Sequence, residues 1–323
     1  MRWITVAALS LASCDLAPKP APAAATPRPS APASSSAGPV LPIPTEAPPE
    51  PSAAPAPPPP ASSASAPPAC PDEMARAGRV CVDRWEARLM SISPDGARAP
   101  HPHTERPDPA LRYVAVSEPG VHPQGYVSRV EAAAACREAG KRLCTLDEWT
   151  RACKGPRWTT FPYGGRGEAG RCNTGKDHLL SKLFGTNGRA WKYDEHFNSP
   201  LLNGEPGFLE KTGERAGCVS PEGVFDMVGS LHEWVSDAVT EDLVERMEKE
   251  PVERKKQPWR EGNGVFMGGF FSTTKEHGPG CTFMTIAHEP RYHDYSTGFR
   301  CCKAPAGLPP APAKKKKKPA RAP

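Results

Sequence analysis

Hydrophobic and polar residues follow helical or strand periodicity only over short stretches in the middle of this chain. Residues 128–131 (SRVE) form a capping box, in which the serine hydroxyl and a glutamate three residues later bond the first free amides of a helix. They predict a helix through Cys136 to about Ala139, ended by Gly140. Residues 145–148 (TLDE) form a second capping box, which predicts a helix to about residue 154.

Three further runs have the composition of short strands, at 79–86, 264–271 and 297–303. Long irregular segments separate them. We therefore expect an α+β domain with little regular secondary structure, which needs covalent cross-links to be stable.

Composition divides the 323 residues into one domain with flanks. Residues 15–69 hold 19 of the chain's 42 prolines and are otherwise mostly Ala, Ser and Thr, so they predict a disordered tether that reaches ~170 Å when extended. The globular domain is expected at 70–306, and 307–323 is a disordered Lys-rich tail. The net charge of +5 falls to about −1 without Lys314–Lys318 and Arg321, which argues against nucleic-acid binding by the domain.

The first 14 residues have the pattern of an export signal. A basic Arg2 precedes an apolar run at 3–12, and residues 11–14 (LASC) resemble a bacterial lipobox. This predicts that Cys14 is lipidated and holds the protein on a bacterial membrane, with the domain in the periplasm or at the cell surface. An ordinary signal peptide with a chance cysteine is the alternative.

Ten cysteines remain besides Cys14, and an even number in an exported chain predicts a disulfide framework. Zinc is the competing interpretation, but no two of them form a CxxC pair. Cys301 and Cys302 are adjacent, so on a strand they face opposite sides and need different partners.

Several segments, in order, resemble the formylglycine-generating enzyme or sulfatase-modifying factor family. They are CVDRWE at 81–86, GKRLCTLDEW at 140–149, FPYG at 161–164, VFDMVGSLHEWVSD at 224–237, GG at 268–269 and GFRC at 298–301. The resemblance implies a variant of the C-type lectin fold. It also implies two disulfides, Cys136–Cys301 and Cys153–Cys281; the remaining cysteines suggest Cys144–Cys302, Cys172–Cys218 and Cys70–Cys81.

Active members of that family bind copper through two cysteines after the GGS segment. The corresponding residues 270–280 (FFSTTKEHGPG) contain no cysteine. Because Cu(I) needs thiolate ligands, the resemblance argues against copper and against formylglycine generation here.

Related branches, in ergothioneine biosynthesis and pyoverdine maturation, also lack the cysteine pair. An iron site would need two histidines and a carboxylate converging on one ion. The candidate ligands are His232, His277, His288 and His293 with Glu233 or Asp294, and of these His277, His288 and His293 are the catalytic candidates. Ordinary surface or hydrogen-bonded histidines are the alternative.

The family also carries calcium sites, and hard oxygen ligands in a loop-rich fold suit Ca²⁺. The matching residues are Asn173 and Thr174 for one site and Ser230, Leu231 and Glu233 for the other. Ser230 replaces a family Asn, and Glu233 has an equally good interpretation as a hydrogen-bonded loop carboxylate.

Two functions follow as hypotheses. The first is a monomeric, non-catalytic binding or scaffold module for an envelope peptide, protein or glycan, with Trp234, Phe270, Phe271 and Tyr292 lining its cleft. Those aromatics fit a core equally well. The second is a non-haem-iron oxidoreductase acting on an envelope protein or peptide, as the pyoverdine-type relatives suggest.

Overall fold

The computed structural model of the chain describes residues 69–249, 257–274 and 277–307. The expected signal peptide with Cys14, most of the tether and the lysine run lie outside the described residues. No helix of the described segments is long and apolar enough to cross a membrane.

The two capping boxes begin the two helices that the sequence predicts. Ser128 Oγ accepts from the Glu131 amide at 3.3 Å and Glu131 Oε2 accepts from the Ser128 amide at 2.8 Å, which starts α1 (Arg129–Glu138). Thr145 and Glu148 form the same reciprocal pair before α2 (Leu146–Lys154), which ends at Gly155 with a φ of 62°. Satisfying the first amides in this way fixes both helix starts.

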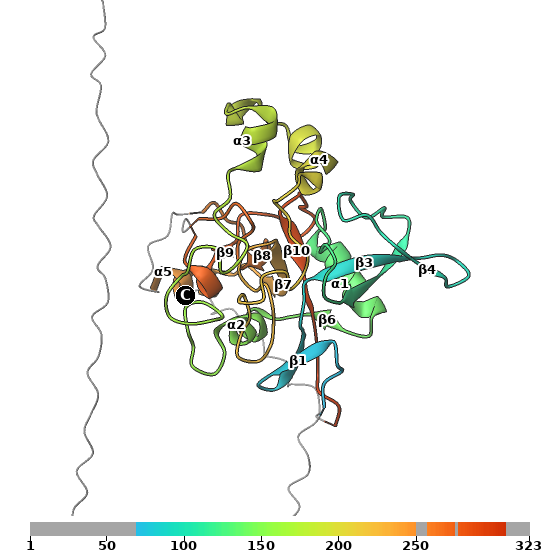
Figure 1. Cartoon of the computed structure of the whole chain (residues 1–323), viewed down its shortest axis with the longest axis vertical. Helices are drawn as coiled ribbons and strands as arrows, with labels where there is room; N and C mark the ends of the chain where they lie inside the picture. Colours follow the sequence, from blue (N-terminus) through green and yellow to red (C-terminus); the bar gives the residue numbers. More distant parts are fainter. Residues whose placement is uncertain (1–68, 250–256, 275–276, 308–323) are drawn as a thin grey trace, which may run out of the picture. The chain divides into compact units, whose positions relative to one another are not determined.

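Short strands form three small sheets (Figure 1). Their orders are β1-β2-β11-β6, β10-β7-β8-β9 and β4-β3-β5, antiparallel except for the parallel pair β10 and β7. The strands are β1 (Met74–Ala77), β2 (Val80–Asp83), β3 (Ala87–Ile92), β4 (Arg98–Pro100), β5 (Arg112–Ser117), β6 (Arg142–Leu143), β7 (His232–Ala238), β8 (Gly264–Met267), β9 (Met284–Thr285), β10 (Thr297–Phe299) and β11 (Cys301–Lys303).

Helical segments that the sequence did not predict complete the domain. They are α3 (Leu179–Phe184), η1 (Gly188–Ala190), η2 (Tyr193–Phe197), α4 (Pro200–Gly204), α5 (Glu241–Lys249) and η3 (Gly280–Thr282). In Figure 1, α3 and α4 lie together, away from the three sheets. They enclose an apolar cluster that includes Leu180, Leu202 and Phe208.

Five disulfides join elements that are distant in sequence, and they are the pairs expected from the sequence. They are Cys70–Cys81, Cys136–Cys301, Cys144–Cys302, Cys153–Cys281 and Cys172–Cys218. Cys301 packs into the apolar cluster beside α1 and Cys302 into the cluster around Trp149. The alternation of side chains along β11 therefore ties the last strand to α1 on one face and to the start of α2 on the other.

Candidate functional site

A cavity of about 470 Å³ lies over the second sheet. The side chains that line it come from β7, β8 and β9, from the loops that follow β8 and β9, and from the segment before α3. They are Lys176, His178, His232, Phe266, Phe270, Ser272, Thr273, Thr274, His277, Phe283, Thr285, His288, Tyr292, Asp294 and Ser296. Rings and hydroxyl groups alternate around the cavity, a mixture typical of a ligand pocket.

His232, the first residue of β7, forms a buried part of this wall. It is 7% exposed, and its ring lies 4.7 Å from Phe266 and 5.1 Å from Phe270, centroid to centroid. Burial lowers the pKa of His232 to about 3, and that of His288 to about 4. Both imidazoles are therefore neutral at any ordinary pH.

A stacked pair of rings and a short hydrogen bond form another side of the cavity. The rings of His288 and Tyr292 are 3.8 Å apart, and Tyr292 Oη donates to Asp294 Oδ2 at 2.6 Å. Asp294 Oδ1 accepts from both the amide and the hydroxyl of Ser296. The Asp294 carboxylate is thus engaged on both oxygens within the protein.

A second hollow of about 700 Å³ adjoins the cavity and shares Thr273, Thr274 and Phe283 with it. Its far wall is the loop around Phe161 and Tyr163, whose rings stack at 5.6 Å. A ligand longer than one residue has room to extend from the cavity into this hollow.

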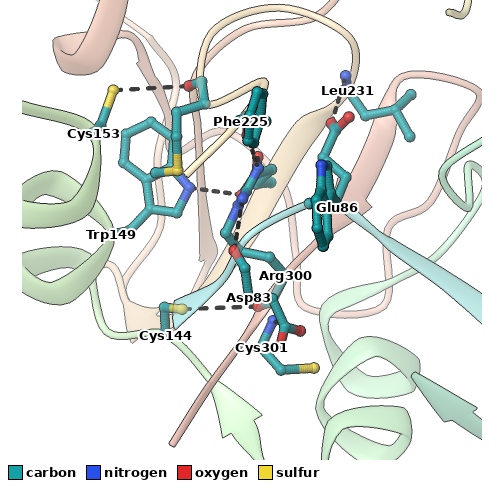
Figure 2. A network of polar contacts seen from close by, with 12 residues as sticks. Asp83, Glu86, Cys144, Trp149, Cys153, Phe225, Leu231, Arg300 and Cys301 are labelled. Carbon is teal, nitrogen blue, oxygen red and sulfur yellow. Dashed lines mark hydrogen bonds and ion pairs between the residues drawn. The ribbon is translucent and has the colours of Figure 1, made fainter. Parts of the chain in front are cut away.

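A buried polar network lies beneath these surfaces, centred on Arg300 between β10 and β11 (Figure 2). Arg300 donates to the two oxygens of Glu233 at 2.6 and 2.7 Å, and Trp149 Nε1 donates to Glu233 Oε2 at 2.8 Å. The remaining guanidinium hydrogens reach the backbone carbonyls of Asp83 and Phe225. Arg300 and Glu233 are both essentially unexposed, so this network fixes β2, β7 and β11 relative to one another.

Residues 85–305 match the family model described as a sulfatase-modifying factor enzyme 1-like domain. The chain belongs to this family. The match covers the cavity, the second hollow and the Arg300 network. No curated protein matches the chain.

Several solved structures are similar to this sulfatase-modifying factor domain. PvdO from Pseudomonas aeruginosa is 14% identical, with a TM-score of 0.37 over 70% of this chain and 80% of that one. CarF is 16% identical, with a TM-score of 0.34 over 57% and 68%. The P3c variant of the major tropism determinant is 15% identical, with a TM-score of 0.36 over 73% and 53%.

The donor set of the domain does not fit the copper of the family's active members. All ten cysteines of the described residues are in disulfides, including Cys172 and Cys281, which line hollows. A cystine sulfur is not a thiolate, so it is not a ligand for Cu(I).

The histidines meet only part of the requirement for iron. His232, His277 and His288 line one cavity, but the structure places His293 outside it, where its Nδ1 hydrogen-bonds Asn198 at 2.8 Å. The described residues hold no group of three or more His, Cys, Asp or Glu that is arranged for a metal ion. The catalytic roles of His277, His288 and His293 stay predictions, with His293 placed apart from the other two.

Two of the four aromatics proposed to line a cleft do so. Phe270 and Tyr292 line the cavity. Trp234 is 1% exposed and donates to the Val127 carbonyl at 2.9 Å, and Phe271 is fully buried. These two residues belong to the core. Trp234 lies on the same face of β7 as His232 but packs in the apolar cluster beside α1, and Phe271 packs in the cluster that includes Leu202.

The proposed calcium ligands are only partly together. The Asn173 carbonyl accepts from the Ser230 amide at 3.0 Å, and Asn173 Oδ1 is a buried oxygen without a hydrogen-bond partner among the described residues. Glu233 binds Arg300 through both oxygens, as its alternative interpretation as a hydrogen-bonded carboxylate expects. Calcium at Asn173, Thr174, Ser230, Leu231 and Glu233 stays a prediction.

Sequence reasoning missed the hydroxyl-bearing wall of the cavity and the partner of Glu233. Thr285 and Ser296 belong to short segments that carry no motif, and no local spacing brings them to His232. For Arg300 the sequence does contain a signal. Arg300 lies inside the run 297–303 that is predicted to be a strand, and an arginine that is buried there needs an acidic partner.

Asp226 gives the domain a testable dependence on pH. It is 5% exposed, it accepts from the Gly213 amide at 2.6 Å, and burial raises its pKa from 3.8 to about 6. A raised carboxyl pKa contributes stability that is complete below pH 3.8 and is lost as the pH rises through 6. We expect Asp226→Asn, which stays neutral, to become more stable than the wild type by up to about 3 kcal/mol between pH 4 and 7.5.

Urea unfolding of both proteins across this pH range measures the difference. Asp194→Asn, at an exposed position, is the matched control and should follow the wild-type curve. A constant difference between Asp226→Asn and the wild type at all pH values would contradict the assignment.

Proposed function

We propose that this chain is a lipid-anchored, non-catalytic binding module of the bacterial cell envelope. Its cavity over β7, β8 and β9 would bind an uncharged segment of an envelope peptide, protein or glycan and leave it chemically unchanged. The observation that carries the proposal is the lining of the cavity, which combines aromatic rings, hydroxyl groups and neutral imidazoles. Such surfaces bind through packing and hydrogen bonds.

The charged side chains of the cavity support binding rather than acid–base chemistry. Lys176 Nζ is held by the Gly207 and Phe208 carbonyls and by Glu210, and Asp294 is held by Tyr292 and Ser296. A general acid or base needs a pKa near the operating pH, whereas His232 and His288 lie far below it.

The binding proposal is tested by selection against the cavity. A displayed random-peptide library and a set of envelope oligosaccharides are bound to the full-length chain, and each ligand found is measured again on Phe270→Ala. We expect at least a tenfold loss of affinity, because Phe270 supplies a ring to the cavity wall.

Trp158→Ala, which removes a 60% exposed ring that does not line this cavity, is the matched control and should bind normally. Ligands that bind both variants equally well would place recognition elsewhere and sink the proposal.

The anchor is supported by the five disulfides, which form in exported proteins, and by the LASC segment at 11–14. We expect cells grown with an alkyne-bearing palmitate to label the wild-type chain, and Cys14→Ser to lose the label and remain a full-length precursor. Labelling that survives in Cys14→Ser would rule out this anchor.

A non-haem-iron oxidoreductase is the second candidate. Its supporting observation is that His232, His277 and His288 line one cavity. Stoichiometric iron that stays on the chain after anaerobic loading and desalting, and is lost in His288→Ala, would favour it over a binding module.

A further inference from the structure

We propose that the cavity over β7, β8 and β9 is a carbohydrate site, which takes a neutral sugar residue and bonds one of its hydroxyl groups through His232. This inference rests on the proposed binding function and names the class of its ligand. Four features of the cavity support it. They are a buried histidine nitrogen without a hydrogen-bond partner, the lack of an available charge among the described side chains, the pairing of the strands beneath the cavity, and the rings and hydroxyl groups of its wall.

His232 presents a polar atom that the protein itself leaves unsatisfied. The residue is 7% exposed and lines the cavity, and its Nδ1 is buried with no hydrogen-bond partner among the described residues. The aromatic rings of Phe266, Phe270 and Phe283 surround the imidazole within 4.7 to 5.5 Å, centroid to centroid. Buried polar atoms are nearly always paired in folded proteins, so a ligand group is the natural partner.

The charge of the cavity selects an uncharged ligand. Lys176 and Asp294 are both held by neighbouring groups of the protein, and His232 and His288 are neutral because burial lowers their pKa values to about 3 and 4. A phosphate or carboxylate ligand would lose its hydration without meeting an available cation among the side chains that the structure describes. A hydroxyl group of the ligand loses less hydration energy than an anion does, and it can donate a hydrogen bond to a neutral imidazole or accept one from it.

The sheet under the cavity argues for a sugar over an extended peptide. An extended peptide gains affinity by adding a strand to an open sheet edge. β7 is paired on both sides, with β10 and β8, and β8 is paired with β7 and β9. The two edges of this sheet are β10, from which no residue lines the cavity, and β9. β9 is two residues long, and the Met284 amide in it already donates to the His277 carbonyl at 3.2 Å.

The wall itself matches the two kinds of surface that a sugar ring carries. Phe270, Phe283 and Tyr292 offer apolar groups to its C–H groups, and Thr274 and Thr285 offer hydroxyls to its polar edge. The hydroxyls of Ser272 and Ser296 already donate to the Asp177 carbonyl and to Asp294, which leaves them as acceptors. The volume of about 470 Å³ lies in the range of small-molecule pockets. The adjoining hollow of about 700 Å³ leaves room for a second and third sugar residue.

The test is calorimetric titration of the full-length chain, with its disulfides intact, at pH 5.5 and 7.5. The probes are four neutral trisaccharides (chitotriose, cellotriose, maltotriose and mannotriose), the anionic trigalacturonate and the neutral peptide Gly-Ser-Thr-Gly-Asn. We expect at least one neutral trisaccharide to bind, with the same affinity within twofold at both pH values, and more tightly than trigalacturonate or the peptide.

His232→Phe keeps the aromatic packing and removes Nδ1, so it should weaken that trisaccharide at least tenfold. His101→Phe, outside the cavity, should bind as the wild type does. If His232→Phe does not fold, as judged by its urea midpoint, Thr285→Val provides a second test of the same wall and should weaken binding at least threefold.

The outcomes separate this inference from the proposed function. Binding of the peptide without any trisaccharide overturns the carbohydrate site and leaves a binding module. Tighter binding of trigalacturonate, or unchanged affinity in a folded His232→Phe, also overturns it. If no probe binds and the library selection on the cavity fails as well, both proposals fall.

Discussion

Removing the Cys136–Cys301 and Cys144–Cys302 disulfides together will destabilise the domain by about 7 kcal/mol, about 1 kcal/mol more than the sum of removing each alone. The two bonds span 165 and 158 residues and end on adjacent cysteines of β11. While one remains, losing the other reopens a loop of only about ten residues, which costs about 3 kcal/mol on the chain-entropy model. Losing both leaves the nearest cross-link at Cys153–Cys281 and costs about 7 kcal/mol in all.

A loss of that size is comparable to the whole stability of an ordinary domain. We therefore expect each double-serine variant to unfold cooperatively at a lower urea concentration, and the quadruple variant to lack near-ultraviolet circular dichroism at 25 °C. The Cys70→Ser/Cys81→Ser variant is the control, because its loop of 11 residues lies apart from the others. Its cost of about 3 kcal/mol should add to that of either pair. If the stability costs of removing all three disulfides simply added, the Cys136–Cys301 and Cys144–Cys302 bonds would not share a loop.

The elements predicted correctly are those with a strong local signal. Both capping boxes fix helix starts through groups three residues apart, so α1 and α2 could be placed within a residue or two. The strands predicted at 79–86 and 264–271 are shorter in the structure, Val80–Asp83 and Gly264–Met267, because Gly268 and Gly269 adopt positive φ values that end β8.

Helices α3 and α4 escaped prediction because they are short and their stability comes from tertiary packing. α4, for example, has five residues and buries Leu202 against α3, and no periodicity can be read over so few positions. α5 is as long as α2, but the residue three positions after Thr240 is Leu243, so no capping box marks its start. The ordered family motifs, in contrast, located two disulfides correctly, across 165 and 128 residues, and the remaining cysteines gave the other three pairs.

The candidate site was only half predictable for a related reason. Phe270 and Tyr292 were found by residue type, but Trp234 and Phe271 have the same type and lie in the core. His232 and Trp234 lie on the same face of β7, so the difference between them comes from the chain that covers them: the Val127 carbonyl accepts from the Trp234 indole and the cluster beside α1 packs against it. Residue type alone carries no information on which segment covers a side chain.

The Arg300 network contains more buried acidic than basic side chains. Removing the arginine should therefore have an unusually large effect on the stability of the domain. Glu86 and Asp226 lie close enough to influence Glu233 and Arg300, and all four side chains are buried. Burial and the charge of Glu233 raise the pKa of Glu86 well above its usual range, while Arg300 opposes this rise. Without the guanidinium, Glu233 would remain a buried carboxylate beside two further acids.

We expect Arg300→Met to lower the free energy of unfolding by about 3–5 kcal/mol at pH 7.5, the usual cost of breaking a buried ion pair from one side. The loss of unfolding free energy should be smaller at pH 5, because protonation of the buried carboxyl groups removes the excess negative charge. Adding Glu233→Gln to Arg300→Met should recover most of the loss, because the amide oxygen can still accept from Trp149 while carrying no charge.

Arg142→Met is the matched control, since Arg142 binds Glu148 through two bonds of 2.6 Å but is 45% exposed. An exposed pair of this kind contributes at most about 1 kcal/mol. Urea unfolding of the four proteins at pH 5 and 7.5 gives all the comparisons at once. If Arg300→Met cost no more than Arg142→Met, or if Glu233→Gln restored nothing, the charge balance would not be what holds β2, β7 and β11 together, and packing around Trp149 would have to account for it.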